Sequence, residues 1–373
     1  MENDVLIEQS LAVAPRNIQG VARPVRIWLY IGLVMVFFQV VIGGVTRLTD
    51  SGLSITEWAV IQGTLPPLNH AEWLDAFEQY KIAAKKQYES LHADMTLSEF
   101  KVIYFWEYFH RLWARLMGFV FVFPFLFFLW KKWMPSWLLR RLGVVILLAM
   151  VAATAGWVMV KSGLNNDQRT WVSAYKLITH LGIATTLFAY LFWTCLKAGA
   201  TPRGRDGRHQ YLRRFAWGLT VLLVVQILFG GLMAGMRAGL LHPYWPAFVE
   251  GERLWYALGQ TDQADLAGVV NYERAVFVKA VVQVVHRALA YLLTGLVIWL
   301  VVRAKRRDIS PLLNRGLNLL IILLVTQFTL GVLTVINSFG SIPVTYGTLH
   351  QGVALLLLAA LLFVNFQLRP VRN

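Results

Sequence analysis

The sequence predicts an all-α integral membrane protein whose eight transmembrane helices form two four-helix bundles related by a pseudo-twofold axis. Of the 373 residues, 57% are hydrophobic and the mean hydropathy is +0.54. Eight segments are apolar enough to span a bilayer, and the two halves of the chain repeat each other. Only 15% of residues are charged, against about 25% in soluble domains. This composition excludes a cytosolic enzyme, which needs a polar shell, and a disordered chain, which is rich in charge.

The eight expected spans follow from length and polarity. A helix needs about 20 mostly apolar residues to cross the hydrocarbon core. Segments that satisfy this lie at 26–45, 107–130, 140–160, 176–196, 215–236, 279–302, 316–336 and 347–367. Because the number of spans is even, both termini are expected on one side of the membrane. The chain then divides into a tail at 1–25, an N-terminal bundle at 26–200, a C-terminal bundle at 201–367 and a tail at 368–373.

The distribution of charge predicts which side is cytoplasmic. The side of the termini carries 20 of the 35 basic residues and only 5 of the 20 acidic ones, and so holds the whole net charge of +15. The positive-inside rule therefore places both termini in the cytoplasm. The basicity is a topology signal, and we expect no nucleic-acid partner. The acidic N-terminus lacks the basic-then-apolar start of a signal or transit peptide, which favours a bacterial inner membrane over an imported organelle protein.

Two outer loops, at 46–106 and 237–278, are long, and long loops with some structure of their own usually carry function. In the first loop, Asn69 with Glu72 and Thr96 with Glu99 have the spacing of a capping box. We therefore expect an amphipathic helix near 70–90 and a second helix from about 97 that continues into the second span.

An internal duplication relates spans one to four to spans five to eight. The matched positions are Gln39-x-x-x-Gly43-Gly44 with Gln226-x-x-x-Gly230-Gly231, His110-Arg111 with His286-Arg287, and His180 with His350. The offsets of 187, 176 and 170 residues shrink steadily because the outer loops differ in length. Four spans per half give both halves the same orientation, so the expected axis runs along the membrane normal.

Four of the eight histidines are expected in the outer third of a span. An ionisable residue at membrane depth is costly and is a functional candidate, although a single one can also serve as a polar bridge between helices. Zinc or copper usually needs three or four converging ligands, and the one cysteine, Cys195, forms no cysteine-rich site. Two imidazole pairs on facing helices are typical of bis-histidine haem. The candidate ligands are His110, His180, His286 and His350, whereas His70, His92, His209 and His242 are expected on solvated loops.

The residues around these histidines leave several interpretations open. Arg111 and Arg287 can pair with haem propionates or extend to lipid headgroups. Glu107 lies one turn outward from His110 on the same helix face, and its counterpart Gln283 cannot ionise. Just one of the two pockets thus has a carboxylate beside it, which indicates proton chemistry in that pocket and electron transfer in the other. The alternative is that Glu107 is a water-exposed residue at a helix end. Close approach of helices or of a macrocycle, or plain helix packing, explains the small residues Gly43, Gly44, Gly156, Gly230, Gly231 and Gly331.

Together these motifs resemble the haem A synthase family over roughly residues 25–367. The residues that carry the resemblance are Glu107-Tyr-x-His110-Arg111, Gly43-Gly44-Val-Thr-Arg47-Leu-Thr-Asp50-Ser-Gly-Leu-Ser, His180, His286-Arg287 and His350. The long first outer loop and the lack of loop cysteines resemble the alphaproteobacterial and mitochondrial branch. The resemblance implies conversion of haem O to haem A for terminal oxidases, with the C8 methyl oxidised to a formyl group by successive hydroxylations.

The resemblance also implies roles for individual residues. His286 and His350 are expected to ligate the iron of a resident haem B, with Arg287 beside it. His110, His180 and Arg111 are expected to face the haem O substrate, and Glu107 to be essential for its oxidation. The haem sites are expected toward the periplasmic side, within membrane lipid, and haem O synthase is the implied pathway partner. A homo-oligomer and the identity of the electron acceptor are left open.

Two other classes of protein compete with this interpretation. An electron-transfer membrane cytochrome with bis-histidine haems would share the histidine pairs but would not need Glu107. A transporter would show discontinuous helices and charges at the midplane of the bilayer. The ionisable residues here lie near the outer ends of the spans, which makes a transporter the weakest of the three interpretations.

Overall fold

The computed structural model describes residues 21–57, 65–164, 170–199, 210–246 and 252–369. Over these residues the chain is all-helical, without strands, and eight helices are long and apolar enough to cross a membrane. This confirms the predicted multi-pass membrane protein. The eight helices are α1 (Arg23–Leu48), α4 (Leu97–Trp130), α5 (Ser136–Lys161), α6 (Ala174–Gly199), α7 (Gln210–Met236), α10 (Val276–Lys305), α11 (Pro311–Ile336) and α12 (Val344–Gln367). Each contains the whole of the span predicted for it.

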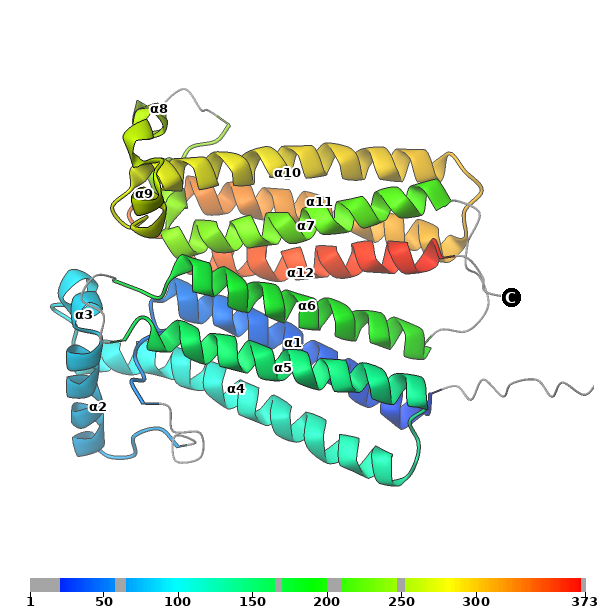
Figure 1. The fold of residues 1–373 in the computed structure, drawn as a ribbon, viewed down its shortest axis with the longest axis horizontal. Helices are drawn as coiled ribbons and strands as arrows, with labels where there is room; N and C mark the ends of the chain where they lie inside the picture. The colour runs from blue at the N-terminus through cyan, green and yellow to red at the C-terminus, as the bar shows by residue number, and fades with distance from the viewer. Residues whose placement is uncertain (1–20, 58–64, 165–169, 200–209, 247–251, 370–373) are drawn as a thin grey trace, which may run out of the picture.

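The short helices gather at one end of the bundle (Figure 1). The expected helix near 70–90 is two helices, α2 (His70–Ala83) and α3 (Lys85–Leu91), which meet at Ala84. The expected start of α4 is confirmed, because Thr96 and Glu99 form a reciprocal capping box. The second long loop folds into α8 (Glu252–Gly259), α9 (Leu266–Val270) and the 3₁₀ turns η3 (Ala238–Leu241) and η4 (Thr261–Gln263).

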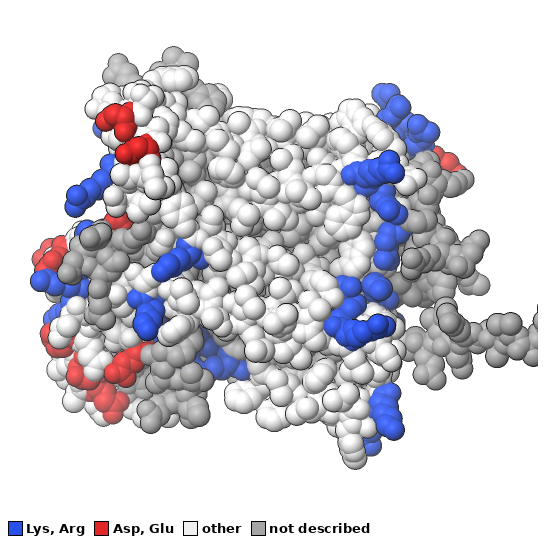
Figure 2. Space-filling model, in the orientation of Figure 1, with Lys and Arg blue, Asp and Glu red and all other residues white. Residues whose placement is uncertain are grey.

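Charged side chains separate the two ends of the molecule. In the view of Figure 2, the end opposite the short helices is rimmed mainly by Lys and Arg, while the end with the short helices carries both signs. The first described residues of α1 and the last of α12 lie at the basic end (Figure 1). This is the charge pattern that the sequence predicts. Most of the predicted N-terminal tail, His209 with its loop neighbours, and residues 370–373 fall outside the described residues.

The eight long helices form two groups of four (Figure 1). One group holds α1, α4, α5 and α6, and the other holds α7, α10, α11 and α12. The groups meet through contacts of α1 with α12, α6 with α7 and α6 with α12. In the duplication α1 corresponds to α7 and α6 to α12, so the first two contacts are counterparts of each other. These contacts are consistent with the predicted repeat, and the division into two bundles related by a pseudo-twofold axis stays a prediction.

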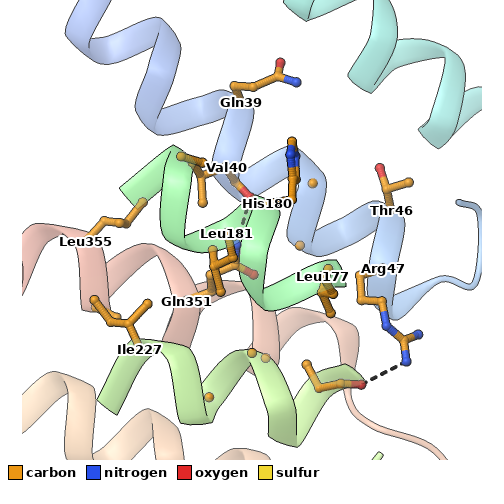
Figure 3. A pocket seen from close by; sticks show the side chains of 18 of the residues that line it. Gln39, Val40, Thr46, Arg47, Leu177, His180, Leu181, Ile227, Gln351 and Leu355 are labelled. Carbon is orange, nitrogen blue, oxygen red and sulfur yellow. Dashed lines mark hydrogen bonds between the residues drawn. The ribbon is translucent and has the colours of Figure 1, made fainter. Parts of the chain in front are cut away.

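Glycines permit the close approach of the two groups. A Cβ on Gly44 of α1 would overlap the amide of Gln351 on α12, whose Nε2 donates to the Val40 carbonyl at 2.8 Å (Figure 3). A Cβ on Gly231 of α7 would lie 2.9 Å from Leu181 Cδ2 on α6. Gln351 and Leu181 each directly follow a matched histidine. Matching residues of the two halves therefore make matching contacts: α1 packs closely on α12, and α7 packs closely on α6.

Each group also has its own apolar core toward the basic end. In the first group the fully buried residues include Leu29, Leu138 and Leu191, and in the second they include Leu300 and Leu313. These cores fill the bundle from the basic end and leave the histidines nearer the end with the short helices. The site therefore rests on packed helices rather than on loops.

We expect Gly235→Ala to destabilise the protein. A Cβ at this position would lie 2.7 Å from Ala174 Cβ and 2.9 Å from Ala174 Cα, and the backbone atom cannot move aside without shifting α6. Overpacking of this kind costs about 1–3 kcal/mol, so the thermal midpoint of the detergent-purified protein, followed by tryptophan fluorescence, should fall. Gly218→Ala on the same helix is the matched control, since a Cβ there meets no atom within 4 Å. Equal midpoints for the two variants would contradict the contact.

Candidate functional site

All four predicted histidines line one cavity of about 900 Å³ that is walled by helices of both groups. This volume lies in the range of small-molecule and cofactor sites. Figure 3 shows His180 of α6 among side chains from α1, α7 and α12, which include Gln39, Ile227 and Leu355. The walls are mostly apolar. The fold thus brings together side chains that lie up to 240 residues apart in the sequence.

Each histidine packs against a glycine on the long helix that precedes it in the chain. A Cβ on that glycine would lie 2.9–3.3 Å from an imidazole atom, which is tighter than ordinary van der Waals contact. The four pairs are Gly43 with His110, Gly156 with His180, Gly230 with His286, and Gly331 with His350. The missing Cβ makes room for each ring. The expected close approach at these glycines is therefore an approach to the imidazoles themselves.

Three of these glycines are preceded, one helical turn earlier, by a glutamine that contacts the same imidazole. The Nε2 atoms of Gln39, Gln226 and Gln327 lie 2.9, 3.5 and 3.3 Å from Nε2 of their histidines. The amide oxygens of all three are buried without a hydrogen-bond partner, and Gln226 is only 9% exposed. Unsatisfied buried oxygens are costly, so these groups indicate a pocket shaped for a further group. At His180 the corresponding residue is Ala152.

The separation of the second histidine pair fits two ligands to one metal ion. The ring centroids of His286 and His350 are 6.4 Å apart. With nitrogen–metal distances of about 2.0–2.1 Å, two imidazoles on opposite sides of a metal have centroids about 6 Å apart. His350 Nδ1 donates to the Gln327 carbonyl at 3.1 Å, which leaves Nε2 for a metal. Among the described residues no group of three or more His, Cys, Asp and Glu side chains could hold a metal ion.

The first pair repeats part of this arrangement. His180 Nδ1 donates to the Ala152 carbonyl at 2.9 Å, the counterpart of the His350 contact. Gln39 Nε2 also donates to the His110 carbonyl at 3.3 Å, as Gln226 does to that of His286 at 3.0 Å. The residues present in both halves therefore fit a haem-type group held or faced by two imidazoles.

Glu107 is buried at 3% exposure and is held by three donors. Ser54 Oγ and the Ile55 amide donate to its Oε2 at 2.8 and 2.9 Å, and Arg111 Nη2 donates to Oε1 at 2.6 Å. Since all three groups donate, they suit a carboxylate anion. The alternative that Glu107 is a water-exposed helix-end residue is wrong. Arg111 also donates to the carbonyls of Ile55 and Glu57, both at 3.0 Å, so it fixes the loop to the helix.

The corresponding place in the second half is built differently. Gln283 is fully buried and donates to the His242 carbonyl at 2.8 Å, while Arg287 is buried nearby. His242 itself is only 1% exposed, and its ring packs near Tyr244. The expectation of a solvated His242 is therefore wrong, because its loop folds back over α10. His70 is exposed as expected.

His92 is a second departure from the solvated surface expected for the loop histidines. It is half-buried, and its Nδ1 lies 2.6 Å from the Tyr80 hydroxyl. Burial lowers the pKa of His92 and raises that of Tyr80, so both groups are held neutral at neutral pH. This contact ties α2 to the loop before α4.

A charged cluster that the sequence does not single out joins the two halves at the outer end. Arg237, at the end of α7, forms an ion pair with Asp50, at the end of α1. Arg47 Nη2 donates to the Ala234 carbonyl at 2.9 Å (Figure 3), and the Arg237 guanidinium lies 4.1 Å from the Trp171 ring centroid. Asp50 and Arg237 both have left-handed backbone angles, with φ of 55° and 51°. The sequence feature that could have revealed this pair is the offset of 187 residues between Asp50 and Arg237, which equals the offset between Gly43 and Gly230.

Fold and site define the class: a multi-pass membrane protein with paired imidazoles in a shared apolar cavity and a buried carboxylate beside one pair. The chain matches the COX15-CtaA family model of cytochrome oxidase assembly proteins over residues 26–362, and it belongs to that family.

Its relatives include three proteins named Heme A synthase. The one from Flavobacterium psychrophilum is 39% identical over 90% of this chain and 96% of the relative. That from Nitrosospira multiformis is 38% identical over 94% and 95%, and that from a Bradyrhizobium species is 38% identical over 93% and 92%. The similarity thus extends over nearly the full length of both chains in each case.

We expect Ser54→Ala to lower the free energy of unfolding by about 1–3 kcal/mol, because a buried carboxylate loses a hydrogen-bond donor. A double-mutant cycle with Glu107→Gln, measured by chemical denaturation in detergent, isolates the contact. The serine substitution should cost clearly less in the Glu107→Gln background. Additive effects of the two substitutions would show that Ser54 does not act through Glu107.

Proposed function

We propose that this chain is a haem A synthase, an oxidoreductase that converts haem O to haem A by oxidising the C8 methyl to a formyl group through successive hydroxylations. The full-length similarity to proteins of that name supports the proposal. The observation that carries it in the structure is the asymmetry of the two imidazole pairs. One pair has the buried carboxylate of Glu107 beside it, and the other has the neutral amide of Gln283.

In this proposal His286 and His350 hold a resident haem B by its iron, with Arg287 buried beside them. Their 6.4 Å centroid separation and the glycine seats behind both rings support this assignment. Bound there, haem B would supply a one-electron redox centre. The protein contributes two neutral imidazoles, an apolar wall that excludes water, and the Gln327 carbonyl that fixes the His350 tautomer.

His110 and His180 face the haem O substrate, with Arg111 and Glu107 one turn from His110. Oxidation of a methyl group releases protons at the carbon that reacts. Glu107 is the group placed to take up such a proton or to position an attacking water. Its three donors hold the carboxylate in one orientation, and Arg111 connects it to the loop at Ile55 and Glu57. Arg111 is thus a positioning residue for Glu107 in this proposal.

The cellular setting follows the same proposal. Eight apolar helices make the protein a multi-pass membrane protein. The positive-inside rule supports an inner-membrane location with cytoplasmic termini and with the haem sites toward the periplasmic face. Haem O synthase is the implied supplier of the substrate.

The proposal is tested by identifying the haems extracted from detergent-purified protein expressed with a source of haem O. The wild type should carry haem B together with haem O or haem A. Glu107→Gln should keep haem B and lose haem A, while Glu99→Gln, in the exposed cap of the same helix, should behave as the wild type. Haem B alone in the wild type would instead indicate an electron-transfer cytochrome, and normal haem A output from Glu107→Gln would remove Glu107 from the reaction.

His286→Ala should abolish the bound haem B, because one of the two axial imidazoles is lost. Absorbance of the Soret band relative to protein in the purified sample measures the occupancy. His70→Ala, at an exposed position on α2, is the matched control. An unchanged haem B content in the His286 variant would contradict the pairing of His286 with His350.

A further inference from the structure

The two halves differ where the second and third long helices of each group meet. In the second half α10 packs against α11, and three aromatic residues close the seam between them. The Tyr291 and Phe328 rings are 5.8 Å apart, and Trp245 lies 6.2 Å from Phe328 and donates to the Tyr291 hydroxyl at 2.9 Å. We call these three residues the aromatic plug. All three line the cavity, so the plug separates the pocket of His286 and His350 from the surroundings.

At two of the three plug positions the first half has no aromatic residue. The offset of 187 residues makes Trp58 the counterpart of Trp245, and Trp58 lies outside the described residues. The offset of 176 residues between His110 and His286 places Arg115 where the second half has Tyr291. The offset of 175 residues between Gly156 and Gly331 places Ala153 where it has Phe328. Over the described residues α4 and α5 make at most marginal contact with each other. In the part of the chain that the structure describes, the seam that the aromatic plug closes in one half is therefore open in the other.

Helix α5 carries small side chains along the face that lines the cavity. Ala149, Ala152 and Ala153 all line the cavity, and their spacing places them on the same side of the helix. At the corresponding places α11 carries Leu324, Gln327 and Phe328. Leu324 is buried, whereas its counterpart Ala149 is exposed, as is Ala153. The larger side chains of α11 narrow the second pocket on this side, and over the described residues the alanines of α5 leave the first one wider.

Helix α4 also has a small residue where it lines the cavity. Gly118 lines the cavity, and a Cβ there would meet no atom within 4 Å, whereas its counterpart on α10 is Thr294. Val122, which also lines the cavity, and Phe119, which follows Gly118 in the sequence, are exposed. Both helices are apolar enough to span a bilayer. The opening therefore faces lipid hydrocarbon rather than water.

We propose that the seam between α4 and α5 is a lateral portal through which the substrate's long isoprenoid chain passes between the bilayer and the pocket of His110 and His180. The inference rests on the proposed function, because haem O carries such a chain and haem B does not. The alanines of α5 and Gly118 set the space for the chain. The aromatic plug excludes it from the second pocket. The isoprenoid chain then decides which pocket each haem enters, because the first pocket has room for it and the second does not.

The portal is tested by installing the plug residue of the second half, Ala153→Phe, in the full-length protein in nanodiscs. Binding of haem O and formation of haem A should fall roughly tenfold or more, while the resident haem B content stays at the wild-type level. Val151→Phe is the matched control, since Val151 is exposed on the same helix and does not line the cavity. It adds similar bulk and should leave haem O binding and haem A formation unchanged.

Spectral titrations with haem O and with haem B measure the affinity of the first pocket for a haem with and without the isoprenoid chain. They distinguish a substitution that excludes the chain from one that excludes the porphyrin ring. Ala153→Phe should weaken haem O far more than haem B at the first pocket. Haem A formation at the wild-type rate in Ala153→Phe overturns the portal while leaving the proposed function intact, whereas a wild type that makes no haem A overturns the function itself. If Ala153→Phe lowers the resident haem B, Ala149→Leu, which copies α11 at the matching place, decides the question by the same two titrations.

Discussion

The seating of an imidazole against a glycine on the neighbouring helix is the contact on which the rest of the structure depends. It recurs four times, at Gly43, Gly156, Gly230 and Gly331. Each seat sets how close two long helices can lie and where an ionisable ring sits at membrane depth, where a misplaced polar group is costly. Adding any side chain would push the ring or the helix aside. The four histidines line one cavity, and at three of the four contacts a glutamine lies against the imidazole.

The same scaffold gives two chemically unlike pockets because the groups one turn outward differ. In the first half a loop after α1 folds back, so that Ser54 and Ile55 hold Glu107 in a buried place beside Arg111. In the second half an amide, Gln283, takes that place and binds a loop carbonyl. A carboxylate can accept a proton and a neutral amide cannot, so in the proposed function proton uptake is assigned to the first pocket.

The length of the apolar segments, the distribution of charge and the capping-box spacing predicted the spans and the outer helices. The internal repeat and the expected membrane depth singled out the four histidines as candidate ligands. These features can be recognised in the sequence without knowledge of the tertiary contacts. The break at Ala84 and the burial of His242 were not predicted, since both depend on how a loop packs on helices far away in sequence. The Ser54 contact with Glu107 spans 53 residues and has no periodic signature. The glutamine of span seven could have been found, because Gln327 and Gly331 repeat the spacing of Gln39 and Gly43.

The repeat also shows which features of the two pockets diverged. The imidazoles and their glycine seats are the same in both halves, so the geometry that places a ring against a helix is common to all four positions. The walls around them differ in volume: α11 carries Leu324, Gln327 and Phe328 where α5 carries only alanine. These side chains change the volume of the cavity wall at matching places on the two helices. A duplicated bundle can therefore keep one pocket for a resident group and open the other to an exchanging one by changing the side chains where its second and third long helices meet.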